Sequence, residues 1–226
     1  MLMWTVAFRR TSPRQLAAVA GGALMILFIA GGAVRSASSG AEEAGAFVRD
    51  LAARATTVLA DPALTPAERR GEIGRLLLSK IDTQRIGRFV LGRYWNKTSP
   101  AERTEYLRLF DAYIVATYAQ RLESYSGERL SVETARRLSE TRAVVSSRLM
   151  RLESAPIQAD WQLLRSDGDG KWRIVDVIIE GVSMALTQRS EFGAVIKASG
   201  GRIAPLLDRL QKKTAILTAA VATTPN

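Results

Sequence analysis

The chain has 226 residues, of which 47% are hydrophobic and 24% charged, a balance typical of a globular protein. It contains no cysteine and no histidine, which excludes disulfides, Cys/His metal sites and every catalytic triad that needs an imidazole. Lys and Arg number 32 against 22 Asp and Glu, giving a net charge of +10, so nucleic acid, anionic lipid and acidic proteins are the partners to consider.

The first forty residues have the pattern of an export signal. They contain four arginines and no acidic residue, and residues 16–34 carry no charge. Small residues follow at 36–41, so we expect cleavage between about Ala37 and Ala41. A retained membrane anchor is the alternative, because a helix of this length spans roughly 28 Å. An exported chain rarely meets nucleic acid, so its charge favours anionic lipid or a membrane-protein partner, or is an ordinary solvated surface.

Four helices are predicted next. Apolar residues recur at helical spacing over residues 46–60. Thr65 and Ser99 each begin a capping box with proline at the first helical position and glutamate at the third. Asp82 is the expected cap of a shorter helix that ends near Gly92, and the helix after Ser99 is expected to reach about Tyr125.

The periodicity changes to two from Arg129 onward, which predicts strands over 129–136, 141–152, 157–163 and 172–179. The turn residues at 166–171 join the last two strands into a hairpin. Two further helices follow, separated by Ser199-Gly200-Gly201. We therefore predict one α+β domain over residues 41–214, with an antiparallel sheet of about four strands packed against helices. Residues 215–226 are expected to form a loose tail, with fraying helix over 215–222 as the alternative.

Two observations on sequence motifs argue against a bound metal and a bound nucleotide. The run Asp167-Gly168-Asp169-Gly170 resembles the start of a calcium-binding loop, but the twelfth position is Ile178 instead of glutamate, so we expect a turn and no metal. The chain has no glycine-rich loop followed by Lys-Ser/Thr, so we expect no bound nucleotide and no other cofactor.

Asp176 interrupts an apolar strand, and a buried carboxylate must be paired or have a raised pKa. One hypothesis makes it the general base of a small isomerase with a ketosteroid-isomerase-like fold. The other, which we favour, makes it the partner of an arginine, because buried acids are more often structural than catalytic.

Apolar side chains on the long fourth helix and on the strands predict either an interior cavity of drug or lipid size or an ordinary packed core, and a core explains Phe110, Tyr113 and Ile178 equally well. Trp161 and Leu163 are expected to face it, because they alternate with Gln158, Asp160 and Gln162. The candidate lining residues are Phe110, Tyr113, Tyr118, Ile157, Trp161, Leu163, Ile174 and Ile178.

Six stretches carry a family resemblance: residues 91–95, 99–103, 116–119, 172–177, 180–184 and 188–193. They resemble the MlaC family, also called the toluene-tolerance auxiliary family, and the resemblance covers roughly residues 45–212. Residues 125–129 are also similar to its hopanoid-associated HpnM branch.

The resemblance implies a periplasmic carrier, not an enzyme, that holds the acyl chains of a phospholipid, or a hopanoid, between sheet and helices. It also implies lipid exchange with an inner-membrane ABC transporter complex and an outer-membrane lipoprotein, which maintains outer-membrane lipid asymmetry. The implied fold is similar to an NTF2-like cone with added helices around an apolar cavity. The eight candidate residues would then bind lipid.

Overall fold

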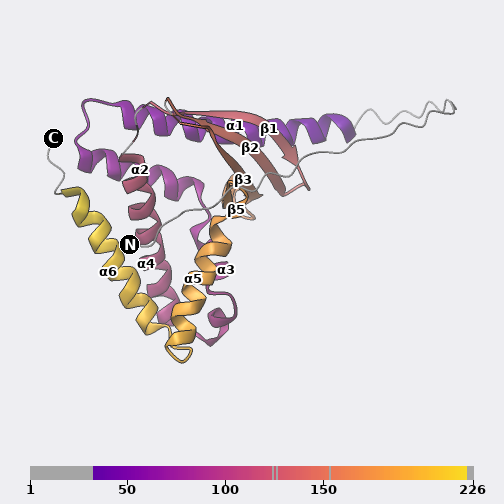
Figure 1. The fold of residues 1–226 in the computed structure, drawn as a ribbon. Helices are drawn as coiled ribbons and strands as arrows, with labels where there is room; N and C mark the ends of the chain where they lie inside the picture. Colours follow the sequence, from indigo (N-terminus) through magenta and orange to yellow (C-terminus); the bar gives the residue numbers. More distant parts are fainter. Residues whose placement is uncertain (1–32, 124, 126, 153, 223–226) are drawn as a thin grey trace, which may run out of the picture. The chain divides into compact units, whose positions relative to one another are not determined.

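The computed structural model describes residues 33–123, 125, 127–152 and 154–222. These residues form six α-helices, one 3-10 helix and an antiparallel sheet, so the predicted α+β class is confirmed (Figure 1). The elements are α1 (Ala33–Ala60), α2 (Pro66–Lys80), α3 (Thr83–Leu91), η1 (Gly92–Lys97), α4 (Pro100–Glu123), β1 (Arg129–Arg137), β2 (Arg142–Met150), β3 (Ile157–Arg165), β4 (Trp172–Ile179), β5 (Val182–Ser183), α5 (Met184–Ala198) and α6 (Ala204–Ala222).

Most of the predicted export signal lies outside the described residues. Helix α1 begins at Ala33, earlier than the periodicity predicted, and continues through residues 37–41, where we expect cleavage. Among the described helices, none combines the length and the apolar character that crossing a bilayer requires.

The helices begin and end where local hydrogen bonds dictate. The side chains of Thr65 and Glu68 cap α2 reciprocally, and Ser99 and Glu102 do the same for α4. Asp82 accepts a hydrogen bond from the backbone N–H of Arg85 at 2.9 Å and caps α3. These predicted boundaries are confirmed, but α6 continues to Ala222, past the point where we predicted a loose tail.

The sheet is a meander in the order β1-β2-β3-β4-β5. Its four long strands are those predicted, and the two-residue β5 is an addition. Within the described residues, strand β1 pairs only with β2, and it carries a bulge between Val132 and Thr134. A second irregularity, between Gln162 and Leu163, shifts the register of β3 against β4.

One face of the sheet packs against α1, and we call it the α1 face (Figure 1). A buried apolar cluster joins the two, because α1 presents small and aliphatic residues at helical spacing. The fully packed members of this sheet cluster are Ala44, Val48, Leu51, Ala143, Val145, Leu163, Trp172 and Ile174.

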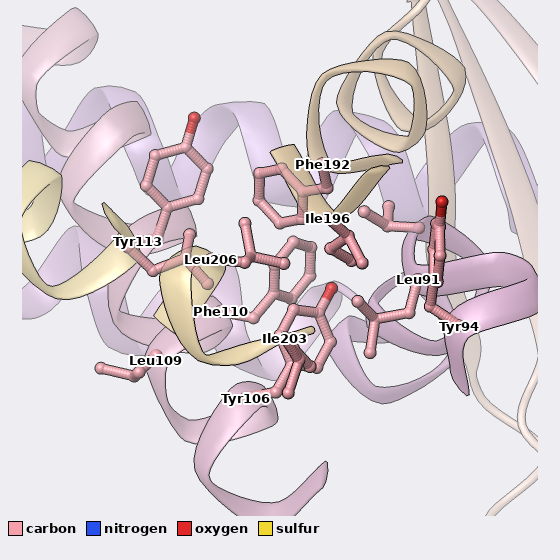
Figure 2. Packing of buried hydrophobic residues seen from close by; sticks show 12 residues of the cluster. Leu91, Tyr94, Tyr106, Leu109, Phe110, Tyr113, Phe192, Ile196, Ile203 and Leu206 are labelled. Carbon is pink, nitrogen blue, oxygen red and sulfur yellow. The ribbon is translucent and has the colours of Figure 1, made fainter. Parts of the chain in front are cut away.

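A second buried cluster lies among α3, η1, α4, α5 and α6, and it contains no strand residue (Figure 2). Its centre is aromatic: the ring centroids of Tyr106 and Phe110 lie 5.6 Å apart, and those of Phe110 and Phe192 lie 6.2 Å apart. We call it the helical cluster.

Glycines let α2 and α3 approach α4 closely. A Cβ atom on Gly74 would lie 2.8 Å from Cγ1 of Val115, and one on Gly87 would lie 2.8 Å from Cδ2 of Leu107. The hydroxyl of Tyr106 donates to the carbonyl oxygen of Gly87 at 3.1 Å across the same contact, and burial raises the pKa of Tyr106. The contacts of α2 and α3 with α4 at these two glycines are therefore close.

Candidate functional site

An apolar strip on the α1 face continues beyond the side chains that α1 covers. In the antiparallel register Leu149 pairs with Ile157, Ile179 with Ala159, and Val177 with Trp161, so these side chains project from the same face. The strip consists of Leu149, Ile157, Trp161, Val177 and Ile179, and each of them is only half-buried.

Hydrogen bonds hold the Trp161 side chain of the strip in place against the sheet. Ser147 is fully buried, and its hydroxyl donates to the carbonyl oxygen of Ala159 at 3.0 Å. The indole Nε1 of Trp161 donates to the same hydroxyl at 2.8 Å. Because this bond satisfies the polar edge of the indole, the ring of Trp161 is held at the sheet and adds apolar area to the strip.

Trp161 and Val177 also contact the sheet cluster, whereas Leu149, Ile157 and Ile179 belong to neither cluster. Large aliphatic side chains that project from a covered sheet face usually pack into a core. Half-exposed apolar surface next to a core is the kind of surface that ligand sites use. The strip is therefore the best candidate site for an apolar ligand.

The structure divides the eight predicted lining residues among several places. Phe110 and Tyr113 belong to the helical cluster. Leu163 and Ile174 are fully packed in the sheet cluster, and Leu163 is only 2% exposed. Only Trp161 and Ile157 lie in the strip.

The remaining two residues point elsewhere. Ile178 pairs with Asp160 and so lies on the face opposite to Trp161. Tyr118 is half-buried on α4, five residues after Tyr113 and thus roughly 140° around the helix axis from it. The sequence analysis missed Leu149, Val177 and Ile179, which the same alternation that marked Trp161 would have identified once the strand pairing was known.

Two hollows lie among the helices. One, of about 490 Å³, is lined by α4, α5 and α6 and includes Tyr113, Glu191 and Lys213. The other, of about 430 Å³, is lined by α3, η1 and α5. Neither is lined by a strand residue, so the predicted cavity between sheet and helices stays a prediction.

Asp176 has a structural role, but its predicted arginine partner is wrong. Its carboxylate accepts a hydrogen bond from the Ser183 hydroxyl at 2.5 Å and another from the Ala185 backbone N–H at 3.0 Å. Ser183 in turn caps α5 by accepting from the Leu186 N–H. The carboxylate therefore stabilises the start of α5, where the helix dipole favours negative charge.

Residues suited to metal binding do not gather in the described part of the chain: no three acidic side chains there come close enough to hold an ion. The predicted calcium-like loop is a turn, in which Gly170 adopts a φ of +64° and its N–H donates to the Ser166 carbonyl oxygen.

Comparison with known proteins gives consistent matches. The family model described as MlaC protein matches residues 49–212. The intermembrane phospholipid transport system binding protein MlaC of Haemophilus influenzae is 25% identical over 139 residues, which are 60% of this chain. The match spans 64% of that relative's length.

A solved structure has the same fold. It is a phospholipid-binding protein from Ralstonia solanacearum in complex with a phospholipid, with a TM-score of 0.67 and 22% sequence identity. The similarity covers 78% of this chain and 99% of the other. Since the family model matches well over half of the sequence, the chain belongs to the MlaC protein family.

Proposed function

We propose that this protein is a lipid carrier that holds the acyl chains of a phospholipid against the apolar strip. The observation that carries the proposal is the strip itself, a row of apolar side chains that stay only half-buried on the α1 face of the sheet. The names of the Haemophilus and Ralstonia proteins support a phospholipid as the ligand, and a hopanoid is the second choice.

The free energy of acyl-chain burial defines what such a site must do. A diacyl lipid with about 32 acyl methylenes exposes on the order of 25 kcal/mol of hydrophobic free energy in water, at about 0.8 kcal/mol per methylene. The strip provides one wall, and helices must close over the chains on the other side. The headgroup would stay near solvent.

The proposal also assigns the carrier a compartment and partners. The carrier would work in the periplasm, between an inner-membrane ABC lipid transporter complex and an outer-membrane lipoprotein. The sequence has no P-loop, so we propose passive exchange: the isolated protein would equilibrate lipid between membranes, and its partners would set the direction.

The decisive experiment is native mass spectrometry of the gently purified protein and of two neighbouring variants. Ile179→Arg places a charge on the strip, whereas Ile178→Arg places the same charge on the opposite face. We expect the wild-type protein to carry lipid, Ile179→Arg to lose at least about nine-tenths of it, because desolvating a charge beside acyl chains is costly, and Ile178→Arg to keep most of it.

Circular dichroism and thermal melting of both variants check the fold. Wild-type protein that is consistently free of lipid would refute the carrier function. Folded Ile178→Arg protein that loses as much lipid as Ile179→Arg would move the site away from the strip.

A further inference from the structure

The hollow between α3, η1 and α5 has a composition different from that of the apolar strip. Three cations line it, namely Arg93, Arg189 and Lys197, and its lining contains no carboxylate. Its floor is apolar, with Val90 and Leu91 on α3 and small residues on α5. The hollow next to α6, in contrast, has Glu191 among its cations. We call the first hollow the basic groove.

The three cations of the basic groove are not neutralised by acidic residues of the described part of the chain. Several arginines on other helices do have such partners: Arg54 pairs with Asp50 on α1, Arg75 with Glu72 on α2, and Arg108 with Glu105 on α4. Within the described residues, none of the three groove cations makes an ion pair. Three like charges around one hollow repel each other, and an anion would relieve that repulsion.

Aromatic rings hold the two arginines in position. The guanidinium of Arg189 lies over the ring of Phe89 at 4.8 Å from its centroid, and that of Arg93 lies over the ring of Tyr94 at 5.0 Å. One terminal nitrogen of Arg93 also donates to the Tyr94 hydroxyl at 3.0 Å. The remaining N–H groups of a stacked, planar guanidinium match the oxygens of a phosphate.

Gly92 makes the position of Arg189 possible. Its φ of +52° ends α3, and a Cβ atom there would lie 2.8 Å from a terminal nitrogen of the Arg189 guanidinium. The guanidinium therefore lies directly against the backbone of α3, on the margin of the basic groove.

Exposed apolar side chains flank these cations. Leu186 is 59% exposed and Phe89 is 40% exposed, and Leu186 lines the groove three residues before Arg189, on the same side of α5. Cations next to exposed leucine and phenylalanine are typical of surfaces that rest on a bilayer, where phosphates meet the cations and the apolar groups enter the interface.

We propose that the basic groove docks this protein onto bilayers that contain anionic phospholipid, with headgroup phosphates bound between Arg93, Arg189 and Lys197. This surface is distinct from the strip and does not depend on lipid being carried there.

The test is flotation with vesicles of phosphatidylcholine alone and of phosphatidylcholine with 30% phosphatidylglycerol, which gives the second set a negative surface potential. The variant combines Arg93→Gln, Arg189→Gln and Lys197→Gln. Its control combines Arg54→Gln, Arg75→Gln and Arg108→Gln, which removes the same charge from exposed, ion-paired positions.

We expect the wild-type protein to bind only the anionic vesicles, and more weakly as salt rises. The groove variant should bind them on the order of 100-fold more weakly, since each cation near an anionic surface contributes about a fivefold effect. The control should change binding several-fold at most, and Leu186→Ser should weaken it at every salt concentration.

Three results would overturn the proposal: no binding of the wild-type protein to anionic vesicles, equal losses in the groove variant and the control, or unchanged binding in a folded groove variant. Binding of the wild-type groove to a hexaglutamate peptide, without binding to vesicles, would identify an acidic protein as its partner instead. Melting curves show that each variant is folded.

Discussion

The helical cluster and the apolar strip are both rich in large apolar side chains, but they differ in how completely those side chains are buried. Tyr106 and Phe110 have no exposed surface, and their rings pack against each other and against the ring of Phe192. The strip residues Ile157 and Ile179 are only half-buried and belong to neither buried cluster. The same kind of side chain therefore stabilises the fold in one region and, in the carrier that we propose, is left available for a ligand in the other.

If the strip binds lipid as we propose, the helical cluster mainly determines the stability of the fold and the strip mainly determines ligand binding. A closely packed interior has no space for a ligand, and each atom removed from it leaves a cavity. A half-exposed strip contributes less to stability, because its side chains have given up only part of their contact with water. Mutations in the helical cluster should therefore mainly lower the free energy of unfolding, whereas mutations in the strip should mainly lower the amount of bound lipid.

The largest expected effect is on the helical cluster. Phe110→Ala should lower the free energy of unfolding by about 3–5 kcal/mol, because it removes a fully buried ring. Phe89→Ala is the matched control, since Phe89 lies on α3 with 40% of its surface exposed, and it should cost about 1 kcal/mol or less. Urea unfolding followed by circular dichroism measures both, and equal losses would show that the cluster is not closely packed.

A smaller effect should reveal how tightly α2 lies against α4. Gly74→Ala introduces a Cβ atom 2.8 Å from Val115, so overpacking should cost about 1–3 kcal/mol, against a gain of about 1 kcal/mol in helix propensity. Gly71→Ala, one turn earlier with nothing within 4 Å, should show only the gain.

The two alanine variants should therefore differ by about 1–3 kcal/mol in urea unfolding. If Gly74→Ala were as stable as Gly71→Ala, α2 and α4 would have room to separate. The contrast between closely packed helices and a half-buried strip would then be weaker.

The smallest expected effect lies outside both regions. Hydrogen bonds from the Thr65 and Ser99 side chains, and then from their backbone N–H groups, hold the pKa of Glu68 and of Glu102 below the usual value of 4.5. A carboxyl with a lowered pKa in the folded state stabilises the fold above pH 4.5, and that stabilisation is lost as the pH falls through the lowered pKa.

Glu68→Gln and Glu102→Gln should each make stability less dependent on pH below 4.5 and slightly lower it at pH 7. Glu140→Gln, an exposed glutamate outside any capping box, is the control. Urea midpoints across the acid range measure the effect, and identical curves for the capping-box variants and the control would contradict it.

The sequence predicted those parts of the fold that depend on neighbours along the chain. The capping boxes at Thr65 and Ser99, the helix from Asp82 to Gly92 and the turn at 166–171 all follow from hydrogen bonds within a few residues. The alternation in β3 also identified Trp161 as facing one side of the sheet.

The rest depends on contacts between distant segments. Periodicity predicted that Phe110 and Leu163 are buried but not that they lie in separate clusters. The pattern along one helix or strand shows which of its faces is buried, but not which other element packs against that face. Asp176 is held by the start of α5 instead of an arginine, and only the return of the chain at Ser183 creates that contact. The strip could be identified only from the pairing of β2, β3 and β4, which places its five side chains on one face.

The bulge in β1 has a consequence for solubility. A meander leaves its first strand with one side unpaired, and such an edge is a template onto which a second chain could add. The bulge between Val132 and Thr134 interrupts the regular row of backbone donors and acceptors, and Arg129, Glu133 and Arg136 place exposed charges along it. A protein that keeps one sheet face partly apolar is thereby protected from strand-to-strand aggregation at the edge of that same sheet.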